Sequence, residues 1–184
     1  ESKDFVMLQS MLHVSFPGNN YKNWLQDVLK FFETKSGIDK HAFLAILSTI
    51  ANTEFSYIKA SQYNLGTHTP RYLFNYLDYI LWNEYDKNVK GKYIKSNLSE
   101  VQRKMLLCKD KFNSFRFTQN NSVEHVAPQN PIDGSPAVRQ LNSFGNLCLI
   151  SSSTNSRLIN LGFDGKKEYF KSTKSVESLK QTLI

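Results

Sequence analysis

Residues 122–129 read Ser-Val-Glu-His-Val-Ala-Pro-Gln, and this stretch decides how the rest of the chain is interpreted. Apolar residues flank the Glu124–His125 pair, which is typical of a strand, and Pro128 closes that strand because proline lacks the backbone N–H that a ladder needs. Neighbouring strand residues point to opposite faces. One member of the pair can therefore bind a metal while the other approaches substrate, but only if the strand bends nearby.

Downstream, the sequence predicts a second strand and a short helix. Gly-Asn146 opens the apolar run Leu-Cys-Leu-Ile, and the segment Ser-Ser-Thr-Asn-Ser-Arg-Leu begins with good capping residues and carries Asn155. Helix and strand must pack together to bury their leucines, which would bring Asn155 towards Glu124 and His125. The expected scaffold is a β-hairpin followed by a helix, between about residues 120 and 160.

Further segments flank this scaffold. Phe-Arg-Phe-Thr, at residues 115–118, is aromatic and β-branched and favours another short strand. The pieces Lys-Lys-Glu-Tyr-Phe-Lys-Ser and Ser-Val-Glu-Ser-Leu-Lys-Gln-Thr-Leu-Ile, near the end of the chain, are expected to be helical.

Residues 1 to about 112 are expected to form helices, because apolar residues recur there at spacings of three and four. The expected buried faces contain Trp24, Leu25, Val28, Leu29 and Phe32; Phe43, Leu44, Leu47, Ile50 and Ala51; and Tyr72, Leu73, Tyr76, Leu77, Ile80 and Leu81. Thr69 is a candidate N-cap, with Pro70 in the first turn, and Ser99 is the candidate N-cap of a further helix that runs to about Phe112.

Together these patterns predict an α+β fold that is mostly α. A helical part, residues 1–112, packs on a small ββα-metal finger with C-terminal helices, residues 113–184, as one compact unit. The chain begins with Glu1 rather than Met, so we expect it to be a C-terminal fragment of a longer protein.

Composition excludes several classes of protein. No apolar run approaches the ~18–20 residues that cross a membrane, and the first residues do not resemble a secretory signal. Cys108 and Cys148 belong to no C-x-x-C pair, which excludes a zinc ribbon and a disulfide framework and suits the cytoplasm. Both are expected to be small buried residues.

The net charge of +7 favours a polyanionic partner. Basic residues gather between Lys87 and Lys111 against only Glu100 and Asp110, and a solvated helix face is the competing interpretation of this run. The remaining histidines, His13, His41 and His68, lie outside the motif and are read as surface or core residues.

The ordered elements V-E-H-V-x-P-Q, G-N-L-x-L and S-x-x-N-S-R resemble the HNH, or His-Me finger, nucleases. The resemblance is closest to the C-terminal nuclease domain of Gmr-type, modification-dependent restriction enzymes and related phage-defence proteins. Phe163-Asp-Gly-Lys166-Lys167-Glu-Tyr169 stands where that group has F-x-x-K-x-x-Y. The diagnostic match covers about residues 115–172 and is weak over the helical part.

This resemblance implies roles for individual residues. His125 would take a proton from the attacking water, Asn146 would fix the loop that orients it, and Glu124 and Asn155 would hold one Mg²⁺ or Mn²⁺ ion. The remaining expected contributions are DNA-phosphate contacts by Arg157, Lys166 and Lys167, and structural roles for Pro128, Gln129, Asn160 and Tyr169. Two features depart from the usual pattern: Glu replaces Asp at 124, and the stretch from His125 to Asn146 is long.

Elementary chemistry agrees with these roles, because a histidine titrates near neutrality and a hard cation with few protein ligands can stabilise a crowded phosphate. The leading hypothesis is a metal-dependent DNA endonuclease, the effector of a cytoplasmic restriction or antiphage protein. Its expected partners are DNA, including modified phage DNA, and an upstream NTPase or sensing domain, with no membrane. The alternatives are a catalytically inactive HNH-fold module that binds DNA or protein, and a helical regulatory domain that binds protein.

Overall fold

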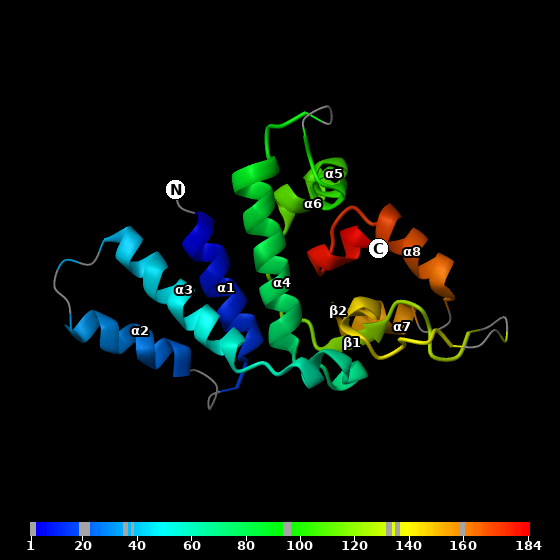
Figure 1. The fold of residues 1–184 in the computed structure, drawn as a ribbon, viewed down its shortest axis with the longest axis horizontal. Helices are drawn as coiled ribbons and strands as arrows, with labels where there is room; N and C mark the ends of the chain where they lie inside the picture. Colours follow the sequence, from blue (N-terminus) through cyan, green and yellow to red (C-terminus); the bar gives the residue numbers. More distant parts are fainter. Residues whose placement is uncertain are drawn as a thin grey trace.

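The computed structural model describes residues 3–18, 23–34, 37, 39–93, 97–131, 134, 137–158 and 161–184. The fold is α+β and mostly α, as predicted. Helix α4 (Arg71–Glu84) runs through the middle, with α1 (Lys3–Ser15), α2 (Asn23–Thr34) and α3 (Lys40–Ser56) on one side (Figure 1). The two strands, α7 (Ser152–Leu158) and α8 (Phe163–Ser172) lie on the other side. Two short 3-10 turns, η2 (Ala60–Asn64) and η3 (Gly66–His68), connect α3 to α4.

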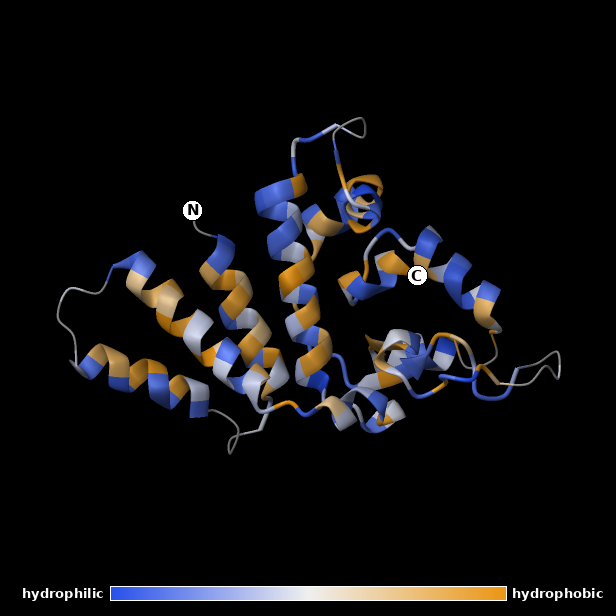
Figure 2. Ribbon diagram, viewed as in Figure 1, coloured by the Kyte–Doolittle hydropathy of each residue, from blue (hydrophilic) through white to orange (hydrophobic). Residues whose placement is uncertain are grey.

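Helix α4 is buried on more than one face. Phe74 and Leu81 are core residues, and the polar Asn75 and Asp78 are buried as well, so hydrophobic and hydrophilic residues alternate along this central helix (Figure 2). The apolar stripe predicted for it is wrong at Ile80, which is 45% exposed. A simple amphipathic pattern fails here because α4 packs on the helices of one side and on the sheet of the other.

The predicted cap of α4 is also wrong. The N-cap is Pro70, which has no side chain able to cap, and Thr69 instead follows the turn η3 as its C-cap. The Thr69 side chain is buried, and its hydroxyl has no hydrogen-bond partner among the described residues. The entry into α4 is therefore fixed by the preceding turn rather than by a capping hydroxyl.

The helix predicted for residues 24–32 is confirmed as α2, but its apolar face is only partly covered. Trp24 and Val28 are buried against α1 and α3, whereas the other three members of the predicted face are exposed: Leu25, Leu29 and Phe32. Helix α3 buries Leu47, Ile50 and Ala51, as its spacing predicted. The hydrophobic spacing identified both helices but did not reveal how much of each face is covered.

Past the π-helical turn η4 (Tyr85–Val89), Ser99 is confirmed as an N-cap. Its hydroxyl accepts the Gln102 N–H, and the Gln102 side chain accepts the Ser99 N–H in a capping box. The single helix predicted to run to Phe112 is instead divided at Cys108 into α5 (Glu100–Leu107) and α6 (Lys109–Ser114).

The sheet of the described part of the chain is an antiparallel pair, β1 (Ser122–His125) and β2 (Leu147–Ile150). Glu124 pairs with Cys148 and His125 with Leu147. Every β2 residue is buried, because one face packs on Phe74 of α4 and the other joins the cluster beneath α7 (Ser152–Leu158) and α8 (Phe163–Ser172). The predicted order of hairpin strands and helix is confirmed.

The strand predicted at residues 115–118 is wrong, because this segment has no regular secondary structure. The rings of Phe115 and Phe117 meet edge to face, 5.0 Å apart, and Phe115 is buried in the cluster that contains Trp82. These aromatic residues anchor a connection to α4 rather than a sheet.

At the C-terminus, the second predicted tail helix is limited to the 3-10 turn η6 (Leu179–Leu183), which lies against α4 and α5 (Figure 1). Asp78 of α4 accepts bonds from the Ser178 hydroxyl and the Lys180 N–H, so the tail is tied to the central helix. The division at residue 112 into two parts stays a prediction. None of the described helices combines the length and the hydropathy that crossing a lipid bilayer requires.

Candidate functional site

A cleft of about 470 Å³ lies where the end of β1 meets the turn that precedes α4. The motif contributes Glu124, His125, Pro128 and Gln129, and α8 contributes Lys166. The remaining lining residues are Leu65, Gly66, Thr67, His68, Asn130 and Asn142. The helical part of the chain therefore forms one wall of the cleft and the finger forms the other.

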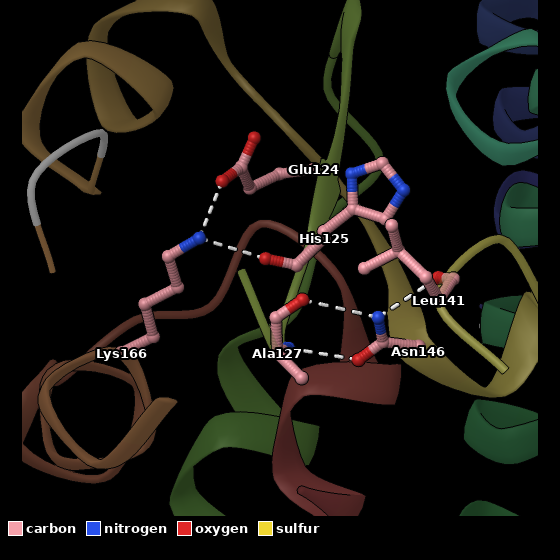
Figure 3. Close-up of polar contacts among 6 residues, drawn as sticks. All are labelled: Glu124, His125, Ala127, Leu141, Asn146 and Lys166. Carbon is pink, nitrogen blue, oxygen red and sulfur yellow. Dashed lines mark hydrogen bonds and ion pairs between the residues drawn. The ribbon is translucent and has the colours of Figure 1, made fainter. Parts of the chain in front are cut away.

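Glu124 and His125 point to opposite sides of β1, as neighbouring strand residues do, and the cleft reaches both because the strand ends there (Figure 3). The His125 residue is 8% exposed, and the Glu124 side chain is 18% exposed. Glu124 and His125 thus line the same cleft, as expected, and the carboxyl and the imidazole point to different parts of it.

The carboxyl of Glu124 is held by a buried lysine. Lys166, in the first turns of α8 and 2% exposed, places its ammonium 2.5 Å from Glu124 Oε1 and 2.7 Å from the carbonyl oxygen of His125 (Figure 3). Lys166 was expected to contact DNA phosphate from the helix flanking the site. The lysine does reach the cleft, but from within the protein and paired with the predicted metal ligand.

The Asn146 side chain joins two segments by hydrogen bonds: the chain just after β1, at Ala127, and the loop before β2, at Leu141. Its Oδ1 accepts the Ala127 N–H at 2.8 Å, while its Nδ2 donates to the carbonyls of Ala127 and Leu141 at 3.2 and 2.9 Å (Figure 3). Its own carbonyl accepts the Val126 N–H at 2.8 Å. This geometry agrees with the expected role of fixing the loop beside His125; a catalytic contribution of Asn146 stays a prediction.

The clamped loop also orients the histidine ring. Asn142, next to the residue that Asn146 holds, has its Oδ1 3.0 Å from His125 Nε2. An amide oxygen only accepts, so this contact requires Nε2 to be the donor, which in the neutral ring leaves the lone pair on Nδ1. The contact therefore selects the tautomer in which Nδ1 can act as a base.

Gly66 makes room for this contact. Its φ of +58° lies in the left-handed region that favours glycine, and its N–H donates to the Asn142 carbonyl at 3.2 Å. A Cβ atom at this position would lie 2.7 Å from Asn142 Oδ1. A larger residue at position 66 would displace the Asn142 side chain and break its contact with His125 Nε2.

Asn155, the predicted second metal ligand, is half-buried on α7, and the cleft lining does not include it. Arg157 and Tyr169 line a separate depression beside α7, and Lys167 lies over the Phe163 ring, 5.5 Å from its centroid, along a different groove. Asn160 lies outside the described residues. The predicted site residues therefore divide into a cleft group and a peripheral group, whose roles stay predictions.

A divalent cation does not fit the predicted ligand pair in this arrangement. Lys166 already neutralises Glu124, and Asn155 is not at the cleft. The described residues also contain no group of three or more His, Cys, Asp or Glu side chains able to hold a metal. An ion at Glu124 Oε1 would have to displace the lysine ammonium, and an ion at Oε2 would lie beside that positive charge.

The run of basic residues after Lys87 is not one free cationic face. Lys87 and Lys90 lie near Asp4 and Asp86, and Lys104 and Lys111 donate to backbone carbonyls near the C-terminus and at the end of α8. Lys95, which belongs to the same run, lies outside the described residues. The basic run therefore does not by itself identify a DNA-binding surface.

A second buried lysine supports the site from behind. Lys180 of η6 is 7% exposed, and its ammonium donates to the carbonyls of Phe144, Gly145 and Leu147, in the turn that carries Asn146. Burial lowers the pKa of Lys180 to about 8 and raises the pKa of Asp78 to about 7.

The two cysteines are free, and the burial predicted for both is confirmed for Cys148 but not for Cys108. Cys148 is buried in β2, and its burial raises the pKa of the thiol to about 12, so it carries no reactive thiolate at neutral pH. Cys108 is half-buried at the break between α5 and α6.

Sequence reasoning missed six cleft residues, and three of them have side chains or backbone that bear on the site: Gly66, His68 and Asn142. His68 was interpreted as a residue outside the site, but it ends the turn η3 that forms the opposite wall. Its position just before the Thr-Pro that precedes a buried helix was the only available signal. Asn142 lies four residues before Asn146, and nothing local distinguishes it from a loop asparagine.

A Glu-His strand end, an asparagine clamp at the next strand and a following helix define an HNH nuclease-like finger. Residues 53–183, well over half of the chain, match the family model of the GmrSD restriction endonucleases, C-terminal domain. The chain belongs to this family, and membership implies nuclease activity in restriction in general terms. No curated protein and no solved structure shows a significant match to the chain.

Proposed function

We propose that this chain is a DNA endonuclease that hydrolyses phosphodiester bonds in the cleft between β1 and η3. His125 Nδ1 takes a proton from water, and the water oxygen bonds to phosphorus while the bond from phosphorus to the leaving ester oxygen breaks. The leaving oxygen takes up a proton, for which His68 on the opposite wall is the candidate donor. His125 Nε2 keeps its own hydrogen and donates it to Asn142 Oδ1 throughout the reaction.

The observation that carries this proposal is the orientation of His125. General bases need a pKa near the working pH and a lone pair directed at the reacting water. The ring is held at Nε2 by Asn142, and that loop is held by Asn146, so little reorganisation is needed when substrate arrives. The Lys166 ammonium lies in the same cleft, where it can counter the charge of the scissile phosphate.

Dependence on Mg²⁺ or Mn²⁺ is part of the proposal through the family, whose restriction nucleases typically use divalent metals. The proton transfers proposed for this cleft belong to protein side chains. Activity in the cytoplasm, modified phage DNA as the substrate, and an upstream NTPase or sensing domain are likewise proposals that rest on the family alone.

The decisive experiment is nicking of supercoiled plasmid by purified protein with Mg²⁺, with Mn²⁺ and with EDTA. We expect His125→Ala to reduce the rate by at least about 100-fold, the usual contribution of a general base. The exposed His41→Ala is the matched control and should retain full activity.

Full nicking activity by His125→Ala would overturn the role of this residue. DNA binding that weakens steeply with salt, with no nicking by any variant or metal, would favour the inactive HNH-fold module instead. The absence of both would favour a helical domain that binds protein.

A further inference from the structure

The ion pair between Lys166 and Glu124 differs from the other described ion pairs. Lys87–Asp4 and Lys90–Asp86 join half-exposed lysines to carboxylates over 3.8 and 3.0 Å, whereas Lys166 is buried and its nitrogen is 2.5 Å from Glu124 Oε1. A buried ammonium is retained only when acceptors replace its water. Glu124 and the His125 carbonyl are two such acceptors.

The position of Lys166 is set by the fold rather than by surface attraction. Its backbone N–H donates to the Gly162 carbonyl at the start of α8, and Phe170, one turn later, is buried in the cluster under β2. The side chain is thereby directed at the strand end. In the DNA-free protein the ammonium therefore occupies a defined place in the cleft, beside Glu124 and the His125 carbonyl.

We propose that Lys166 is a resident cation that competes with divalent metal ions for Glu124, so that the DNA-free protein has no tight metal site at this carboxylate. The biological role of this competition rests on the proposed nuclease function, but the competition itself can be measured without it. A positive charge within a few ångströms of Glu124 opposes a second cation at the same oxygen, and a divalent ion feels that opposition twice over. Metal then enters the cleft only when an anion such as DNA phosphate draws the ammonium away.

The test is direct binding of Mn²⁺, followed by electron paramagnetic resonance, to DNA-free protein at low ionic strength. We expect the wild-type chain to lack a stoichiometric site that depends on Glu124. K166M should bind one Mn²⁺ at least about tenfold more tightly than the wild type. The double variant E124Q/K166M should lose that gain.

K167M is the matched control, because it removes the same charge from the next residue of α8, which lines a different groove. It should leave Mn²⁺ affinity near the wild-type value. K166Q repeats the test with a neutral side chain that can still donate to the His125 carbonyl, in case K166M does not fold.

Tight Mn²⁺ binding by the wild type that is abolished by E124Q overturns the inference without any lysine variant. Equal affinities for wild type, K166M and K166Q overturn it as well. Neither result depends on DNA cleavage, so failure of this inference and failure of the nuclease proposal are distinguishable.

Discussion

The two buried lysines of the C-terminal third occupy opposite kinds of environment. Lys166 faces the cleft and shares its ammonium between a carboxylate and one carbonyl, whereas Lys180 faces the interior and donates to three carbonyls beneath the rings of Phe74 and Phe144. Lys166 balances the negative charge of Glu124, a carboxylate at the cleft. Lys180 stabilises the turn that carries Asn146.

One small finger thus combines a rigid region around Lys180 with a charged region around Lys166 that faces the cleft. Neutral carbonyls satisfy the Lys180 ammonium without attracting cations or substrate, so that region is structural. The Lys166 region keeps a charged pair beside open space, where an incoming anion or cation can exchange partners with it. Four experiments bear on this difference.

The largest expected effect is a pH dependence centred on Asp78. Its folded pKa is about 7 and its ordinary value is 3.8, so the folded chain keeps a proton that the unfolded chain releases. This contribution to the free energy of unfolding is full below about pH 4 and is lost as pH rises through 7. At 1.36 kcal/mol per pKa unit, the loss is on the order of 4 kcal/mol.

Asp78→Asn keeps the acceptor oxygen but cannot titrate. Urea unfolding between pH 4.5 and 7.5 should show the wild type losing stability relative to this variant as pH rises. The exposed Asp164→Asn controls for the loss of one negative charge. A difference between wild type and Asp78→Asn that stays constant with pH would refute the assignment.

Lys180→Met should lower the free energy of unfolding by about 3 kcal/mol, since three backbone carbonyls lose their donor at roughly 1 kcal/mol each. Denaturant unfolding measures this loss. At one pH, Asp78→Asn should change the stability of Lys180→Met by about as much as it changes that of the wild type, because the ammonium donates to carbonyls and not to that carboxyl. Rescue by the second change would show that Lys180 is an ion-pair lysine like Lys166.

Lys166→Met should cost about 2 kcal/mol of unfolding free energy, less than a fully buried pair because the Glu124 side chain retains some exposure. Here the second change does matter: Glu124→Gln combined with Lys166→Met should recover most of the loss. A double-mutant cycle measures the coupling. Simple additivity of the two single changes would place Lys166 in the structural class with Lys180.

The smallest expected effect concerns the histidine. Asn142→Ala should reduce the nicking rate about tenfold, which corresponds to about 1.4 kcal/mol, because the His125 ring loses its tautomer-selecting partner. Asn142 is exposed, so the melting temperature should barely change. Asn130→Ala, at the same cleft, is the control. An unchanged rate for Asn142→Ala would mean that Asn146 alone orients the loop.

Several features were predictable from local sequence. Strand alternation around Glu124, the apolar run after Asn146 and the capping residues before α7 each specify a hydrogen-bonding pattern within a few residues. The Ser99 capping box is local in the same sense. Where a local signal competed with packing, packing decided: residues 115–118 became a docking segment, and the predicted helix after Ser99 was divided at Cys108.

The sequence by itself determined the order of the finger, the family resemblance and the histidine at its centre, because these depend on spacing along the chain. Only the tertiary structure decided that Lys166 neutralises Glu124, that Gly66 admits Asn142 and that Asn155 stays outside the cleft. Those contacts join residues tens of positions apart, and their free energy depends on burial. Spacing alone does not encode burial.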